Sequence, residues 1–412
     1  MPIFTQLFLI FLSIGTLLQL WLLWRHLGYV SRHRGQVPRE FSDSVTLDEH
    51  QKAADYTQAK GRLVIFETVL GVTLLLLWTL GGGLDLLDSF WRGFAWQEII
   101  IGMLFIFSFI LINSLLEMPF DLYRTFRLET AFGFNRTTPL QYLKDRLLGL
   151  MLAILLGGPL LWITLQLMQS AGRYWWLAAW AVWMGFTLTL SWAYPRFIAP
   201  LFNRFTPLDE GEMRNRIQSL LQRCGFTSDG IFVMDGSKRS SHGNAYFTGF
   251  GKSKRIVFFD TLLDALSIDE MEAVLAHELG HFRYKHILKQ MLLMGLLSLF
   301  GLALLGWLSQ QPWFYSGLGI SHPSNAAALL LFMLAIPVFT VFFTPLGSYL
   351  SRRYEFQADN YAVSQTNGKF LVQALVKLYQ DNANTLTPDP LYSLFHDSHP
   401  PAPVRIANIL NQ

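Results

Sequence analysis

The chain has 412 residues, of which 52% are hydrophobic and only 15% are charged, whereas an ordinary soluble domain carries about 25% charged residues. This composition excludes a purely soluble enzyme and a disordered chain, and the single cysteine, Cys224, excludes a disulfide within the chain. The net charge is +3, and basic runs interleaved with aromatic residues are lacking, which excludes nucleic acid as a partner.

Long apolar segments dominate the chain, and a helix of about 20 apolar residues is enough to cross a bilayer. Seven segments meet this requirement: Ile3–Trp24, Leu63–Leu84, Ile99–Leu116, Leu147–Met168, Tyr174–Tyr194, Met291–Leu308 and Asn325–Tyr349. The only charged residue in them is Glu67. It is either a functional carboxylate within the membrane, or an interfacial residue paired with Arg62 or facing a wet interior. The pattern predicts a mainly α-helical, polytopic membrane protein.

The basic residues predict how these spans are oriented. Thirty of the thirty-two Lys and Arg residues fall in segments 25–62, 119–146, 195–289 and 352–412, which all lie on one side of the predicted spans. The positive-inside rule assigns that side to the cytoplasm, with the N-terminus outside or lumenal and the C-terminus inside. We therefore expect a multi-pass protein of a bacterial inner membrane or of the eukaryotic endoplasmic reticulum, with the lipid bilayer as a partner.

Two segments outside the spans are long enough to fold, residues 196–287 and residues 352–412. In the first, apolar residues at helical spacing from Met213 to Cys224 predict a helix that stops at Gly225. Three short runs rich in aromatic and β-branched residues predict strands at Ile231–Met234, Asn244–Phe250 and Arg255–Phe259. The second segment is predicted to be mostly helical.

A capping box from Ser267 to Glu270 predicts the start of a helix that carries the sequence His277-Glu278-Leu279-Gly280-His281. Residues four apart lie one turn apart on the same helical face, so both imidazoles can bind one zinc ion at about 2.0–2.1 Å. Glu278 then reaches the metal-bound water and acts as the general base. The alternative is a solvated helix with two ordinary histidines.

A catalytic zinc of this type needs a third protein ligand. A histidine six residues after His281 is excluded because that position is Ile287, and we expect His286 to be a surface histidine that points away from the site. Glu355 is the better candidate.

Asp359 is four residues after Glu355, on the same helical face, where it could accept the second ring N–H of a zinc-bound histidine. The alternative is that Glu355 and Asp359 pair with Arg352 or Arg353 on an exposed helix.

Further motifs extend over nearly the whole chain: Leu47–Tyr56, Phe132–Asn135, Pro200–Asn203, His242–Phe247, Arg255–Leu262 and His399–Arg405. With the zinc motif and the segment from Glu355 to Asp359, the chain resembles the type I CaaX prenyl endopeptidases, the sterile-24 family of integral-membrane gluzincins. The resemblance implies seven spans around a large water-filled chamber and a small α+β, zincin-like catalytic domain.

The resemblance also implies roles for matching residues. His277, His281 and Glu355 would bind one Zn²⁺ ion, and Asp359 and Arg405 would support the site. Asn244 and His399 would be catalytic residues that orient the scissile carbonyl or stabilise its oxyanion. Asn244 also begins a predicted edge strand, to which an extended peptide could add. The alternatives are a turn residue at Asn244 and a helix-boundary residue at His399.

We therefore predict an integral-membrane zinc endopeptidase whose substrates are peptides or proteins, including prenylated C-terminal peptides. Its expected regions are residues 1–195 with five spans, 196–287 with the first part of the catalytic domain, 288–351 with spans six and seven, and 352–412 with the remainder of the catalytic domain. The alternatives are a membrane-protein quality-control protease without prenyl specificity, a metal-regulated transporter in which Glu67 is central, and an inactive scaffold.

Overall fold

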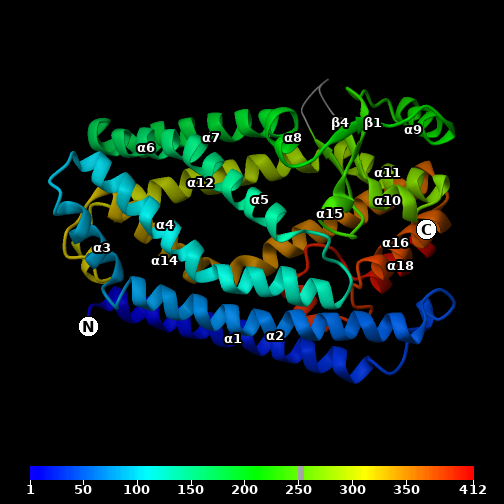
Figure 1. Ribbon diagram of the computed structural model, residues 1–412, viewed down its shortest axis with the longest axis horizontal. Coiled ribbons are helices and arrows are strands. Elements are labelled where there is room, and N and C mark those ends of the chain that lie inside the picture. The colour runs from blue at the N-terminus through cyan, green and yellow to red at the C-terminus, as the bar shows by residue number, and fades with distance from the viewer. Residues whose placement is uncertain (249–254) are drawn as a thin grey trace.

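The computed structural model describes residues 1–248 and 255–412 as one elongated molecule, in which long helices run along most of the length and a small mixed domain lies toward one end (Figure 1). The helices of the long-helix region are α1 (Ile3–His33), α2 (Leu47–Trp78), α3 (Gly83–Arg92), α4 (Glu98–Tyr123), α5 (Pro139–Leu152), α6 (Gly158–Ser170), α7 (Trp175–Ala193), α8 (Ala199–Phe202), α12 (His286–Leu308), α13 (Pro312–Ser316) and α14 (Asn325–Thr340). The helices of the mixed domain are α9 (Glu212–Arg223), α10 (Asp260–Ala265), α11 (Ile268–Arg283), α15 (Thr344–Gln365), α16 (Gly368–Asp381), α17 (Pro390–His396) and α18 (Ala402–Leu410).

The prediction of a mainly helical membrane protein is confirmed. Within the described residues, six helical segments are long and apolar enough to cross a membrane: Ile3–His33, Leu47–Trp78, Glu98–Glu129, Pro139–Ser170, His286–Leu308 and Asn325–Gln365. The predicted span Tyr174–Tyr194 forms α7, whose several tryptophans lower its mean hydropathy. The count of seven spans therefore stays a prediction.

The predicted span Leu63–Leu84 starts inside a longer helix, and its predicted end is wrong. Helix α2 begins 16 residues earlier, at Leu47, because Thr46 and Glu49 form a capping box there. It ends at Trp78, and a turn with Gly82 in the left-handed region (φ 78°) separates it from α3, which contains Leu84. A hydropathy pattern does not detect this turn, because glycine is uncharged and close to neutral in hydropathy. The glycines therefore allow the turn without ending the apolar run.

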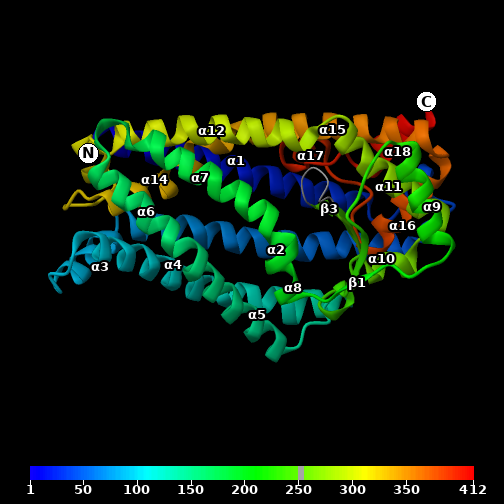
Figure 2. The same ribbon diagram turned by 90° about the horizontal axis from the view of Figure 1, so that it is seen from above.

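The last span continues directly into the mixed domain. Helix α14 is followed by one turn of 3-10 helix, Val341–Phe343, and then by α15, so that the helical path runs from Asn325 to Gln365. In Figure 2, α12 and α15 lie along one long side of the molecule, and α4 and α5 lie along the opposite side. Residues on α15 are therefore joined to a candidate membrane span by a direct helical connection.

A four-stranded sheet with the order β1-β2-β4-β3 forms part of the mixed domain. Its strands are β1 (Phe205–Pro207), β2 (Ile231–Met234), β3 (Ala245–Thr248) and β4 (Arg255–Phe259). Strands β2 and β4 are parallel, and β1 and β3 are antiparallel to their neighbours. The predicted strands at β2 and β4 are confirmed, and β3 is an edge strand as predicted, whereas Gly249 and Phe250 of the predicted strand lie outside the described residues. Strand β1 and helix α10 were not predicted.

The two largest apolar cores organise the molecule. One joins α1, α4, α6, α12, α13 and α14 through buried residues such as Phe8, Phe105 and Leu331. The other joins α9, β4, α11, α15 and α16 through Leu220, Phe258, Met271 and other buried residues. The helix predicted from Met213 to Cys224 is α9, and Gly225 ends it in the left-handed conformation (φ 63°), as expected. The second core holds α11 and α15 side by side.

Candidate metal centre

Helix α11 begins at the predicted capping box, which is confirmed. The Ser267 hydroxyl accepts a hydrogen bond from the N–H of Glu270, and the Glu270 carboxylate accepts one from the N–H of Ser267. Lys377 of α16 lies 2.7 Å from the same carboxylate, which fixes the start of α11 against α16. One face of this helix carries His277 and His281.

Gly280 allows α11 and α15 to approach closely. A Cβ atom at this position would lie 2.8 Å from the Cα of Ala358 and 3.1 Å from its carbonyl oxygen. The obstacle is backbone, which cannot move aside as a flexible side chain can. The short separation brings the histidines of α11 within reach of carboxylates on α15.

Three donor atoms meet between these helices. The Nε2 atoms of His277 and His281 are 3.3 Å apart, and they lie 3.5 Å and 3.4 Å from the two carboxylate oxygens of Glu355. Ligands held tetrahedrally at about 2.0–2.1 Å from one zinc ion are themselves roughly 3.3–3.4 Å apart. Within the part of the chain that the structure describes, Oε2 of Glu355 is buried without a hydrogen bond. The residues present therefore fit a metal ion.

Asp359 and Arg405 orient His277. Oδ1 of Asp359 lies 2.8 Å from Nδ1 of His277, and Arg405 donates to both carboxylate oxygens of Asp359. The Asp359 carboxylate, which pairs with Arg405, accepts the Nδ1–H of His277. Nε2 of His277 then keeps its lone pair, which is directed at Glu355. The structure therefore places both residues beside His277, and the supporting role that the resemblance implied for them stays a prediction.

The pKa values of the two histidines are shifted in opposite directions. Burial disfavours the charged form of His277, but the nearby carboxylates of Asp359 and Glu355 outweigh it and raise the pKa of His277 to about 9. Burial, and then the nearby charge of His277, lower the pKa of His281 to about 4.

Glu278 is half-buried on α11 between the two histidines in sequence. Burial raises the pKa of Glu278, although the charges of His277 and Arg405 partly oppose this shift. A carboxylate with a raised pKa is a stronger proton acceptor than an ordinary one. Its position and basicity are compatible with the predicted role of general base.

The two predicted catalytic residues outside the metal cluster lie in different situations. His399 is in the loop between α17 and α18, is largely exposed, and has its Nε2 atom 3.5 Å from Oε1 of Glu355. Asn244 is exposed just before β3, where its side-chain oxygen accepts from the N–H of Ala245. The structure thus brings His399 to the cluster, whereas the contact expected for Asn244 stays a prediction.

The prediction that His286 is a surface histidine is wrong. The residue is 1% exposed, its Nδ1 atom lies 3.0 Å from Nδ1 of His281, and its Nε2 atom lies 2.8 Å from Oε1 of Gln357. The prediction failed because it extended α11 as an unbroken helix, whereas α11 ends at Arg283 and Lys285 is in the left-handed region (φ 56°), so that the helical spacing from His281 does not carry over to His286. Gln357 was missed as well, although its spacing of two residues from Glu355 and from Asp359 was visible.

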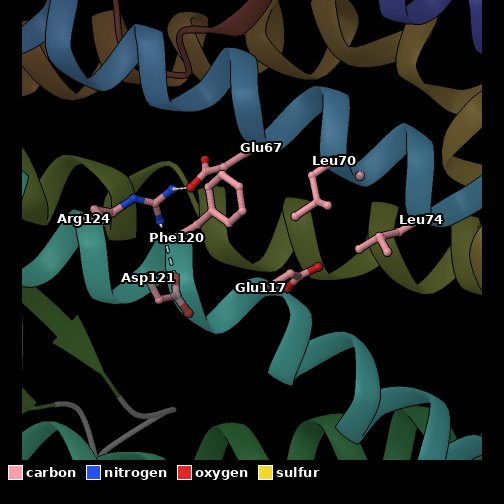
Figure 3. A pocket seen from close by; sticks show the side chains of 8 residues that line it. Glu67, Leu70, Leu74, Glu117, Phe120, Asp121 and Arg124 are labelled. Carbon is pink, nitrogen blue, oxygen red and sulfur yellow. Dashed lines mark hydrogen bonds and ion pairs between the residues drawn. The ribbon is translucent and has the colours of Figure 1, made fainter.

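Glu67 lies away from this cluster, in a cavity of about 270 Å³ between α2 and α4 (Figure 3). Its carboxylate pairs at 2.5 Å with Arg124, which follows α4, and not with Arg62 as one prediction had it. Glu117 and Asp121 also line the cavity. Glu67 therefore has an ion-pair partner, which favours the structural alternative over a free intramembrane carboxylate.

Comparisons with known proteins agree with this geometry. Residues 26–204 match a family model described as the CAAX prenyl protease N-terminal region with five membrane helices, and residues 207–412 match peptidase family M48. A CAAX prenyl protease 1 homolog of Dictyostelium discoideum is 35% identical over 91% of this chain and 89% of its own length. CAAX prenyl protease 1 of Saccharomyces cerevisiae is 32% identical over 89% of this chain and 86% of its own.

A solved structure is similar over the same range. The crystal structure of Ste24p from S. mikatae matches with a TM-score of 0.90 at 30% identity, and the match covers 99% of this chain and 100% of that one. The family models and relatives describe metallopeptidases, which act on peptide or protein substrates with the help of a metal ion. The chain therefore belongs to peptidase family M48, as an integral-membrane metalloendopeptidase of the CAAX prenyl protease group.

Proposed function

We propose that the chain is a zinc endopeptidase in which His277, His281 and Glu355 bind one Zn²⁺ ion. The observation that carries this proposal is the convergence of two imidazole nitrogens and a buried carboxylate at mutual distances of 3.3–3.5 Å. Two histidines and one glutamate are a common ligand set of catalytic zinc, and this set leaves a fourth position for water or substrate. Asp359 and Arg405 hold His277 in the ligating tautomer.

The bound ion would lower the pKa of water to about 7 and polarise the scissile carbonyl. Glu278 takes the proton from the attacking water and delivers it to the leaving amine, and burial has already raised its basicity. His399, at the open side of Glu355, donates a hydrogen bond to the oxygen of the carbonyl as negative charge develops there. Asn244 orients the same carbonyl.

We further propose that prenylated C-terminal peptides are among the substrates. The relatives at 32–35% identity are named CAAX prenyl proteases. Strand β3 is the edge of the sheet in the order β1-β2-β4-β3, so an extended peptide can add to it by main-chain hydrogen bonds. A chamber between the spans, which the resemblance implies, would favour flexible peptides over folded proteins.

The proposed orientation follows from the basic residues. Thirty of the thirty-two Lys and Arg residues lie on the side that carries the mixed domain, which assigns this domain to the cytoplasm and the N-terminus to the outside or lumen. The metal centre then lies close to the cytoplasmic interface, because Glu355 follows the last span directly.

Cleavage of a farnesylated reporter peptide by the purified full-length protein tests the proposal. We expect hydrolysis to be lost in a chelator and restored by Zn²⁺, and Glu278→Gln to lower the rate by at least about 10²-fold. The matched peptide without the prenyl group, assayed in parallel, tests the substrate class. Hydrolysis retained by Glu278→Gln would contradict the assigned base, and equal cleavage of both peptides would contradict prenyl specificity.

A further inference from the structure

His286 contacts His281, a proposed metal ligand, but is not itself one of the three proposed ligands. Helix α11 ends at Arg283 and Lys285 is in the left-handed region (φ 56°), and His286, the first residue of α12, packs against His281. Its ring stacks on Tyr354 with a centroid distance of 4.1 Å and an interplanar angle of 13°. The imidazole is thus fixed in position on three sides, by His281, Tyr354 and Gln357.

Three side chains form a hydrogen-bonded relay that ends at His281. Nδ1 of His281 lies 3.0 Å from Nδ1 of His286, and Nε2 of His286 lies 2.8 Å from Oε1 of Gln357. Each neutral imidazole has one nitrogen that donates and one that accepts. The direction of one bond in the relay therefore sets the direction of the other.

Only one of the two directions is compatible with metal binding. In the first, Nε2–H of His286 donates to Oε1 of Gln357, and Nδ1 of His286 accepts from Nδ1–H of His281. Nε2 of His281 then keeps its lone pair, which is directed at Glu355, 3.4 Å away. In the second direction the Gln357 amide is turned and donates, every bond is reversed, and Nε2 of His281 carries a hydrogen that blocks ligation.

We propose that His286 is a positioning residue that, together with Gln357, holds His281 in the metal-binding tautomer. The inference rests on the proposed metal site, which requires that Nε2 of His281 carry no hydrogen. His277 is held by a carboxylate and a guanidinium, Asp359 and Arg405, whereas His281 is held by an uncharged relay. The two ligands of α11 are therefore oriented by different chemistry.

The first test compares His286→Phe with His286→Asn in the purified full-length protein. Phenylalanine keeps the stack on Tyr354 but removes both nitrogens, whereas the side-chain oxygen of asparagine can still accept from Nδ1–H of His281. We expect His286→Phe to weaken Zn²⁺ binding, measured by competition with a chelator, by about 10–100-fold, and His286→Asn to stay close to wild type. The absorption spectrum of bound Co²⁺ should change in His286→Phe, because the geometry at His281 is no longer fixed.

A purely structural role would give a different pattern. In that case both variants would lower the unfolding temperature of the metal-free protein and would lose Zn²⁺ affinity equally, which overturns the proposal. Unchanged affinity in His286→Phe would overturn it as well. If wild type itself bound no Zn²⁺, or if His281→Ala bound it as tightly as wild type, the metal site would fail, which is a distinguishable result.

Substitutions of Gln357 test the direction of the relay, and they decide the matter if His286→Phe does not fold. Gln357→Glu offers only acceptor oxygens, so it enforces the direction that allows ligation, and we expect its Zn²⁺ affinity to equal or exceed that of wild type. Gln357→Met has a similar shape but no strong acceptor, and we expect weaker binding. A loss of affinity in Gln357→Glu that equals the loss in Gln357→Met contradicts the proposal.

Discussion

Asp359 and Arg405 form a charge pair within the protein interior. Asp359 is 0% exposed and Arg405 is 7% exposed, and two hydrogen bonds of 2.9 Å and 2.6 Å join them. Replacing both partners of a buried pair by apolar residues can be neutral, whereas removing one partner leaves an uncompensated buried charge. The pair thus stabilises the site mainly by fixing Asp359 against His277.

We predict that Arg405→Met destabilises the metal-free protein by about 3–5 kcal/mol, because it leaves the carboxylate of Asp359 without its partner. Thermal unfolding in detergent measures the effect. The double variant Arg405→Met with Asp359→Asn is the control, and it should lose less stability than the sum of the single variants, because the uncompensated charge is gone. Additive losses would show that the two residues do not act as a pair.

Much of the metal centre could be predicted from single-residue spacing. His277 and His281, and likewise Glu355 and Asp359, are four residues apart, and one turn of helix places each pair on one face. His286 could not be predicted in this way, because its position depends on the left-handed backbone of Lys285, a residue type that gives no signal for such a conformation. Periodicity describes helices well and describes the breaks between them poorly.

At the scale of elements, the contact between α11 and α15 assembles the centre. We predict that Gly280→Ala destabilises the protein by about 1–3 kcal/mol, because the new Cβ would lie 2.8 Å from the Cα of Ala358 and the helices must separate. Zn²⁺ affinity should fall with stability, because separation moves Glu355 away from the histidines.

Gly347→Ala is the matched control on α15, because nothing lies within 4 Å of a Cβ built there. Alanine favours helix over glycine by about 1 kcal/mol, so this variant should be neutral or more stable. Unfolding temperatures and chelator competition on both variants measure the difference. Equal behaviour of the two variants would contradict a special role for close packing at Gly280.

The strands and helices of the mixed domain were predicted with unequal success, for physical reasons. Strand β2 is a continuous apolar run and β4 is one after its first residue, Arg255, and both were predicted at their observed bounds, Ile231–Met234 and Arg255–Phe259. Strand β1 has only three residues, Phe205–Pro207, and one of them is proline, so its pairing with β2 depends on tertiary context. The start of α2 was missed because hydropathy follows apolar length and does not register a capping box.

For the molecule as a whole, the ion pair of Glu67 and Arg124 allows an experiment that distinguishes the protease from the transporter alternative, in which Glu67 is central. We predict that Glu67→Gln leaves reporter-peptide hydrolysis within a few-fold of wild type, because an exposed or half-exposed ion pair contributes only about 0–1 kcal/mol. Glu278→Gln in the same preparation is the comparison, and it should be inactive. A Glu67→Gln variant as inactive as Glu278→Gln would contradict this view of the molecule.

The helical path from Asn325 to Gln365, which includes one 3-10 turn, joins the last span to the helix that carries Glu355. A span that is longer or shorter than the surrounding hydrocarbon tilts to match it, and such a tilt displaces the far end of the helical path. Glu355 lies on that far end, whereas both histidines belong to another helix. Reconstitution in lipids of graded acyl-chain length should therefore give a hydrolysis optimum at one thickness, with metal retention declining on either side.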